Sequence, residues 1–151
     1  MSEQSIPPGL PIWVADHVKL YFEDPEKGHM WDSTPRGGPG VLPTLLLITT
    51  GRKSGKSRIL PLLYRKEDVG FVVVASKGGA PNNPSWFLNL LKTPSCEIHV
   101  GRDHLRVNAR TSEGKERMML WEKMAELYPP YDDYQAKTDR EIPVIVLESA
   151  N

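Results

Sequence analysis

The sequence has a single cysteine, Cys96, no excess of charge of either sign and no long apolar run. One cysteine excludes an internal disulfide and is typical of proteins from a reducing compartment. The 19 basic and 19 acidic residues give no net charge, which disfavours nucleic acid as a partner because general nucleic-acid binders carry a basic excess. No run approaches the roughly 20 apolar residues that a membrane-spanning helix needs. We therefore expect a cytoplasmic protein that binds no nucleic acid.

Several familiar catalytic signals are also missing. The histidines are scattered without the spacing of metal ligands, and there is neither a serine-centred elbow nor a dinucleotide-binding GxGxxG motif. Residues 51–57, GRKSGKS, resemble a P-loop, but three residues separate the two glycines where a P-loop has four. Pro61 also disfavours the helix that a P-loop must open. We therefore expect no metal site and reject the P-loop.

Fourteen prolines and twelve glycines divide the 151 residues into many short elements. Apolar runs and alternating patterns predict six strands, joined mostly by short turns. Proline positions and apolar spacing predict three helices, with Ser112 capping the last of them, and residues 131–138 are a candidate for a further short helix. The predicted strands are residues 44–50, 58–65, 71–76, 96–101, 104–111 and 142–147, and the predicted helices are residues 11–23, 85–92 and 112–128.

These elements favour an α+β, mainly β fold, in which about six antiparallel strands form a small barrel with helices packed outside. Residues 24–40 are rich in proline and glycine, so we expect a linker or a long loop there. The chain would then divide into an N-terminal leader, helix and linker, residues 1–40, and a barrel domain, residues 41–151.

Positive charge is concentrated on one predicted strand–turn–strand unit. Arg52, Lys53 and Arg58 lie there with further cations and without an acid until Glu67. Glycines in the turn expose backbone N–H groups, and Ser54 adds a hydroxyl donor. Such a turn suits a phosphate or a carboxylate. A solvated hairpin tip, whose cations only aid solubility, explains the pattern equally well, and both interpretations stay open at this point.

A glycine-rich loop follows the third predicted strand. Ala75, Ser76, Lys77 and Gly78 lie where the chain turns toward a helix, and paired glycines permit the close approach of a ligand to the backbone. From this stretch alone, a plain connecting loop is the simpler interpretation. Trp86, in the helix that follows, is typical of a core anchor.

Three tyrosines, Tyr128, Tyr131 and Tyr134, follow one another at steps of three. On a helical turn their phenols fall on roughly one side. There they could line an apolar pocket and offer hydroxyl donors. Structural tyrosines that cover the mouth of the barrel are the alternative.

Together and in this order, these stretches resemble the deazaflavin (F420)-dependent nitroreductase family. The resemblance covers about residues 40–148. It implies a split β-barrel related to the FMN-binding barrels, in agreement with the strand pattern, and it implies coenzyme F420, an 8-hydroxy-5-deazaflavin with a phosphate and a polyglutamate tail. The matching motifs are TTGRKSG at residues 49–55, Arg58, PL at 61–62, ASKGGAP at 75–81, NPSW at 83–86, Asn89 and YDDYQAKTDREIPV at 131–144.

The resemblance also implies roles for the residues singled out above. One set would bind the cofactor through cations, a turn hydroxyl, the loop and nearby apolar side chains. A second set would face the substrate, and Tyr131 is implied to lie nearest to the acceptor. The cofactor set is Arg52, Lys53, Ser54, Arg58, Pro61, Leu62, Ala75, Ser76, Lys77, Gly78 and Trp86, and the substrate set is Tyr128, Tyr131, Tyr134 and Ser76.

The implied enzyme is an oxidoreductase that transfers a hydride from reduced F420 to a quinone, a nitroaromatic or another electrophile. The cofactor supplies the chemistry, and the protein supplies orientation and hydrogen bonds. A quinone is the first expectation. Two alternatives remain: a module that binds F420 or a lipid-like ligand without catalysis, and a reductase that uses FMN. FMN lacks the polyglutamate tail and needs fewer cations than the hairpin offers.

The predicted helix over residues 11–23 carries many apolar and aromatic side chains. It could touch a membrane surface, where a lipid quinone would be met. Because it lacks a strongly basic face, we expect it to pack on the barrel instead. Related barrels often dimerise, so a monomer and a homodimer both remain open.

Overall fold

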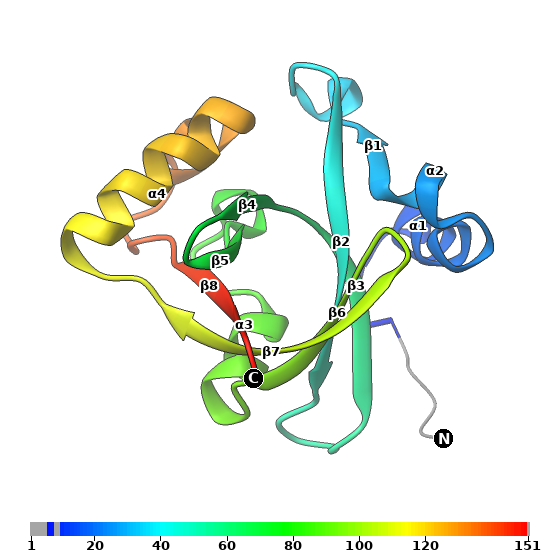
Figure 1. Ribbon diagram of the computed structural model, residues 1–151. Coiled ribbons are helices and arrows are strands. Elements are labelled where there is room, and N and C mark those ends of the chain that lie inside the picture. The colour runs from blue at the N-terminus through cyan, green and yellow to red at the C-terminus, as the bar shows by residue number, and fades with distance from the viewer. Residues whose placement is uncertain (1–5, 8–9, 151) are drawn as a thin grey trace.

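A computed structural model describes residues 6–7 and 10–150 of the chain (Figure 1). Strands form the body of the molecule, and helices lie on its outside. The strands are β1 (Met30–Asp32), β2 (Val41–Thr50), β3 (Ser57–Leu63), β4 (Arg65–Glu67), β5 (Gly70–Val74), β6 (Ser95–Val100), β7 (Asp103–Thr111) and β8 (Val144–Ser149). The α-helices are α1 (Ile12–Glu23), α2 (Pro25–His29), α3 (Ser85–Lys92), α4 (Gly114–Leu127) and α5 (Pro130–Ala136), and two 3-10 turns are η1 (Thr34–Arg36) and η2 (Lys77–Gly79).

The eight strands join in one antiparallel sheet. Their order along the sheet is β1, β2, β6, β7, β8, β5 and β4, and β3 also pairs with β2. Leu46 of β2 lies between two neighbours, paired with Pro61 of β3 and with His99 of β6. The sheet curls round on itself into an open barrel (Figure 1).

The barrel has a seam between β3 and β4. Within the described residues, β3 pairs with β2 alone and β4 with β5 alone. The two strands are consecutive in the chain, and the buried Tyr64 lies between them. The backbone therefore crosses the seam where a sheet ladder would otherwise close the barrel. The hydroxyl of Tyr64 lies 2.7 Å from Nε2 of His29, which ties this crossing to α2.

Alternate residues of the strands face two different cores, as the pleat requires. In β2, Leu45 and Leu47 face the barrel interior, and Leu46 and Ile48 face outward toward α1. β5 and β8 alternate in the same way, with their outward residues packed against α4 and α5. Fully burying a side chain of this size contributes about 1.5–3 kcal/mol. Because both faces of the sheet are buried, one in the barrel interior and one against helices, these strands are continuous apolar runs in the sequence.

The N-terminal segment packs on the barrel through α1, as expected (Figure 1). Val18 and Tyr21 lie against residues of β2 and β3. The Tyr21 hydroxyl donates to Thr44 O at 2.9 Å and accepts from Gly101 N at 2.8 Å. One side chain thus joins α1, β2 and the β6–β7 hairpin. In the part of the chain that the structure describes, no helix has the length and apolar character needed to cross a bilayer.

The predicted fold class is confirmed, and the six predicted strands and three predicted helices are all present. The candidate helix over residues 131–138 corresponds to α5. The boundary between an N-terminal part and a barrel domain at residue 40 stays a prediction.

Three local expectations were wrong. Residues 24–40 are not a linker, because they form α2, β1 and η1, and Asp24 Oδ1 accepts from Lys27 N to cap α2. Residues 65–67 are not split between the end of one strand and a turn: they form β4, which pairs with β5. Ser112 does not cap α4, because its hydroxyl donates to Val144 O at 2.8 Å and Glu113 occupies the cap position.

Candidate active site

An open cavity of about 260 Å³ lies between β3, the loop after β5, α5 and the N-terminal segment. We call it the aromatic pocket. Its lining is mostly apolar, and it is large enough for a ring system, since a cavity of about 150 Å³ already holds benzene. It is lined by Trp13, His17, Trp31, Arg36, Thr44, Pro61, Leu62, Leu63, Val74, Ser76, Lys77, Gly78, Tyr128, Tyr131 and Tyr134.

The three tyrosines form one cluster in the wall of this pocket. Ring centroids are 4.9 Å apart for Tyr128 and Tyr131, and Tyr134 lies 6.2 Å from each of the other two. The Tyr128 hydroxyl donates to Arg36 O at 3.2 Å and lies 3.2 Å from the Tyr134 hydroxyl. Because Tyr128 gives its one proton to that carbonyl, Tyr134 is the donor between the two phenols. None of the hydrogen bonds among the described residues involves the Tyr131 hydroxyl.

Burial keeps the phenols of Tyr128 and Tyr131 protonated. It raises the pKa of Tyr131 far above its usual range, and the neighbouring phenols raise it further. Burial also raises the pKa of Tyr128, and the hydrogen bond with Tyr134 adds to the effect. A protonated phenol is a hydrogen-bond donor. The pocket therefore offers a donor at Tyr131 to any oxygen atom that enters it.

The loop after β5 forms another side of the aromatic pocket. Ser76, Lys77 and Gly78 line it, whereas Ala75 is fully buried in the barrel interior and lines neither this pocket nor the basic pocket described below. Lys77 has a φ of 46°, a left-handed conformation that side chains other than glycine adopt at a cost. Such strain persists only where surrounding contacts hold it. The loop is therefore a fixed part of the pocket wall.

The N-terminal segment closes a third side of the aromatic pocket, which no pattern in the sequence predicted. Trp13 of α1 stacks on Trp31 of β1, with ring centroids 5.9 Å apart and ring planes 17° apart. The Arg36 guanidinium lies 4.9 Å from the Trp13 ring. Arg36 and Lys77 are cations of the lining, and no carboxylate belongs to it among the residues described. Negative charge that develops on a bound acceptor would be stabilised there.

The predicted cationic hairpin lines a second cavity, of about 220 Å³. We call it the basic pocket, and Arg52, Lys53, Ser54 and Arg58 line it together with Pro7, Gly51, Ser85 and Asn89. The buried Asn89 holds the hairpin in place: its Oδ1 accepts from Arg52 N at 3.1 Å and from Arg52 Nη1 at 3.0 Å. Its Nδ2 donates to Thr49 Oγ1 at 3.1 Å. The end of β2 and the start of the turn are thus fixed relative to α3.

One strand joins the two pockets. β3 contributes Arg58 to the basic pocket and Pro61 and Leu62 to the aromatic pocket. At about 3.3 Å per residue, Arg58 and Pro61 lie about 10 Å apart along the strand. A ligand with a flat ring at one end and negative charge at the other could therefore lie along β3.

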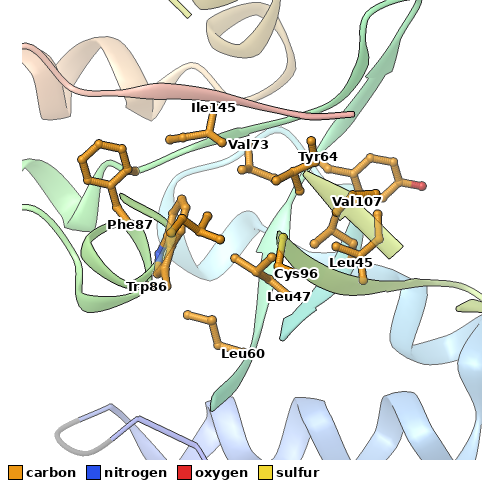
Figure 2. Packing of buried hydrophobic residues seen from close by; sticks show 14 of the residues in the cluster. Leu45, Leu47, Leu60, Tyr64, Val73, Trp86, Phe87, Cys96, Val107 and Ile145 are labelled. Carbon is orange, nitrogen blue, oxygen red and sulfur yellow. The ribbon is translucent and has the colours of Figure 1, made fainter. Parts of the chain in front are cut away.

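Trp86 behaves as the core anchor that the sequence also suggested. It is 5% exposed and packs in the barrel interior with Leu60 and Leu47 (Figure 2). It belongs to the described lining of neither pocket. The contact between Trp86 and the cofactor ring that the resemblance implies stays a prediction.

The residues present fit the parts of coenzyme F420. In the basic pocket, guanidinium, ammonium and hydroxyl groups suit a phosphate and carboxylates, and the described lining has no carboxylate that would repel them. In the aromatic pocket, apolar walls and nearby phenols suit a flat ring and an acceptor beside it. Described residues form no group of histidine, cysteine or acidic side chains that could hold a metal.

Comparison with known proteins gives consistent matches. A model of the F420H(2)-dependent quinone reductase family matches residues 28–149. An F420H(2)-dependent quinone reductase of Mycobacterium tuberculosis is 39% identical over 112 residues, which cover 72% of this chain and 75% of that protein. A solved structure described as an F420-H2 dependent reductase has 45% sequence identity and a TM-score of 0.65, covering 70% of this chain and 93% of that one. A structure described as a domain-swapped dimer has 39% identity and a TM-score of 0.68, covering 90% of this chain and 97% of that one.

The family match runs from α2 through β8 and includes every site residue predicted from the sequence. It confirms the predicted class of F420-dependent oxidoreductases, and it supports F420 against FMN as the cofactor and an enzyme against a module that only binds. This chain belongs to the F420H(2)-dependent quinone reductase family.

Proposed function

We propose that this protein transfers a hydride from reduced F420 to a quinone bound in the aromatic pocket. The observation that carries the proposal is the arrangement along β3, with a cationic pocket at one end and a phenol-lined apolar pocket about 10 Å away. When bound, the cofactor supplies the hydride. The quinone gains that hydride and one proton, and a hydroquinone and oxidised F420 are the products.

Tyr131 is the residue proposed to hydrogen-bond the acceptor. Its hydroxyl is engaged by no other group among the described residues, and its raised pKa keeps it a donor. A donor aimed at the oxygen that gains negative charge stabilises the transition state more than the ground state. Ser76 lines the same pocket and is a second candidate donor. Tyr134 and Tyr128 form the hydrogen-bonded wall beside them.

The stacked Trp13 and Trp31 are proposed to bind the acceptor ring. Aromatic pairs gain from offset stacking or edge-to-face contact, and both tryptophans line the aromatic pocket. The Arg36 cation beside them would attract the electron-rich oxygens of a quinone. Holding donor and acceptor together supplies much of the rate enhancement in such a reaction.

The test is a titration followed by a turnover measurement. Purified protein is titrated with F420 and, separately, with FMN while tryptophan fluorescence is followed, and reduced F420 is then mixed with menadione. We expect tight binding of F420, weak binding of FMN, and oxidation of reduced F420 only with protein and quinone present. Binding of F420 without turnover on any acceptor would contradict the enzyme proposal, and tight binding of FMN alone would contradict the cofactor.

We propose a homodimer in solution, supported by the solved structure described as a domain-swapped dimer, which covers 90% of this chain. Light scattering on the purified protein checks this, with a mass of about twice 17.0 kDa expected.

Membrane contact through α1 is a second proposal. Two apolar residues of α1, Ile12 and Phe22, are exposed. Cosedimentation with lipid vesicles is expected, and it should be lost when both residues are replaced by serine.

A further inference from the structure

Arg140 lies between α5 and β8 and binds the loop that follows β5. Its Nη2 donates to Ser76 O at 2.7 Å and its Nε donates to Ala80 O at 2.8 Å. Its Nη1 donates to Asn83 Oδ1 at 2.9 Å and to Ala75 O at 3.3 Å. One guanidinium thus binds four acceptors on a single loop.

The contacts of Arg140 differ from those of Arg110. Arg110 pairs with Glu116 and Glu148, whereas no ion pair of Arg140 occurs among the described residues. Its acceptors are three carbonyls and one amide oxygen, groups that need donors when they leave a sheet or a helix. The planar fork of an arginine can reach several such groups at once, which a lysine ammonium cannot do.

The backbone of Arg140 is bound to the other wall of the aromatic pocket. Gln135, in α5, donates from its Nε2 to Arg140 O at 2.8 Å. The loop also touches α5 directly: a Cβ added to Gly79 would lie 2.5 Å from Tyr134 O. Arg140 therefore joins the loop that carries Ser76 and Lys77 to the helix that carries Tyr131 and Tyr134.

The loop needs such a support because Lys77, unlike the two glycines that follow it, is strained in a left-handed conformation. Lys77, Gly78 and Gly79 have φ values of 46°, 62° and 83°, three left-handed residues in succession. A conformation of this kind persists only when its surroundings hold it. The hydrogen bonds from Arg140 lie on both sides of these three residues, at Ser76 and Ala80.

We propose that Arg140 is a positioning residue, which sets the spacing between the loop of Ser76–Gly78 and the tyrosines of α5 and so the geometry of hydride transfer. This inference rests on the proposed function and goes beyond it, because Arg140 belongs to the lining of neither pocket. A displacement of about 1 Å in a reacting site costs about 100-fold in rate. The effect should therefore fall on kcat, while binding at the basic pocket stays intact.

The test compares Arg140→Lys with Arg110→Lys, a matched control at an arginine that lies on β7 and lines neither the aromatic nor the basic pocket. For Arg140→Lys we expect kcat with menadione to fall at least about 10-fold, with the Kd for F420 changed less than about threefold. Hydrogen exchange on the protein without cofactor gives an independent readout. The amides of Gly79 and Ala80, which bond to Ser76 O and Lys77 O, should exchange faster, and those of β5 should not.

Each outcome decides the proposal. A lower kcat together with faster exchange at Gly79 and Ala80 supports it. Unchanged kcat, unchanged exchange, or a loss confined to F420 affinity overturns it, as does an equal loss of kcat in Arg110→Lys. If the wild-type protein oxidises no reduced F420 with any quinone, the proposed function fails, and the exchange data still decide whether Arg140 fixes the loop.

A second variant covers the case in which Arg140→Lys does not fold. Asn83→Ala removes one of the four acceptors, the amide oxygen 2.9 Å from Nη1, and leaves the guanidinium in place. We expect kcat to fall and exchange at Gly79 and Ala80 to become faster, each by less than in Arg140→Lys. Wild-type values for both in this variant overturn the proposal.

Discussion

At the scale of single residues, Tyr131 differs from its two neighbours in what its hydroxyl contacts. Tyr128 and Tyr134 are bonded to each other, whereas the Tyr131 hydroxyl has no protein partner in the described chain. We predict that Tyr131→Phe lowers kcat with menadione about 100-fold, with the Kd for F420 unchanged. Tyr128→Phe, whose proton already goes to Arg36 O, should lose less. Full turnover by Tyr131→Phe on every acceptor would rule out its role as a donor.

The pKa of Tyr131 gives a second prediction at this scale. Burial raises that pKa well above its ordinary value of about 10. The phenol therefore stays protonated up to about pH 10, and ionisation does not remove its hydrogen bond to the acceptor in that range. The ratio of wild-type to Tyr131→Phe turnover should therefore stay constant from about pH 6 to about pH 10. Taking the ratio removes the titration of the cofactor itself. A ratio that collapses below about pH 9 would contradict the buried, protonated phenol.

The sequence predicted the tyrosine cluster because three phenols at steps of three share one side of a helical turn. It did not predict that Trp13 and Trp31 line the pocket or that Arg140 holds the loop after β5. The two tryptophans meet only after α1 has packed on the barrel, and Arg140 acts on a loop some 60 residues earlier in the chain. No local pattern reports contacts of that kind, so physical reasoning on one sequence could not place them.

At the scale of elements, the β2–β3 hairpin carries the charge that should bind the cofactor tail. Lys53 is exposed at its turn and lines the basic pocket. We predict that Lys53→Glu weakens F420 binding about 10- to 100-fold, because it replaces a charge-assisted contact with a repulsive charge. Arg102→Glu, an equal change of charge on the β6–β7 hairpin, should leave the Kd within about twofold. Equal losses in both variants would mean that only the net charge matters.

The strand β4 is attached to α4 by Glu67. Its carboxylate lies 2.7 Å from Arg65 Nε and 3.0 Å from Lys123 Nζ, and the hydrogen bonds to Lys123 and Arg65 hold its pKa below the usual value. A lowered pKa stabilises the fold above the unfolded value of about 4.3, and this stability is lost as pH falls through the folded pKa. We predict that Glu67→Gln costs about 1 kcal/mol at pH 7 and makes no difference near pH 3.

Thermal unfolding at the two pH values checks the Glu67 prediction, with a shift of roughly 2–4 °C expected at pH 7. Glu122→Gln is the matched control. Glu122 is an exposed residue of α4, the helix that carries Lys123, and it makes no ion pair within the described chain. A shift of equal size in Glu122→Gln, or one in Glu67→Gln that persists at pH 3, would contradict the role of this ion pair.

Predicted elements were right where one residue pattern dominated. The apolar run of β2 and the alternation of β7 each indicate a strand, and both are present. Residues 24–40 misled because proline and glycine also begin helices and end them, and Pro25 is the first residue of α2. β4 was missed because three residues carry no period of their own, and pairing with β5 alone defines it.

At the scale of the whole molecule, the N-terminal segment and the barrel share their cores. Val14 of α1 belongs to the cluster of the barrel interior, and Tyr21 of α1 packs on β2 and β3. Gly28 lies so close to Tyr21 that an added Cβ would clash with the Tyr21 backbone. We predict that Gly28→Ala lowers the free energy of unfolding by about 1–3 kcal/mol or more. A single unfolding transition should shift as a whole. Lys27→Ala, at the exposed neighbouring residue, should shift it little, and separate transitions would support the boundary predicted at residue 40.

The seam between β3 and β4 affects which electron acceptors fit into the aromatic pocket. Pro61 and Leu62 lie just before the crossing at Tyr64, and both line the aromatic pocket. Within the described residues no sheet ladder joins β3 to β4, so the wall can move outward there without breaking rungs of the sheet. Widening a barrel elsewhere would break such rungs, at about 0.5–1.5 kcal/mol for each hydrogen bond. We therefore expect this side of the pocket to be compliant and to tolerate acceptors of different width.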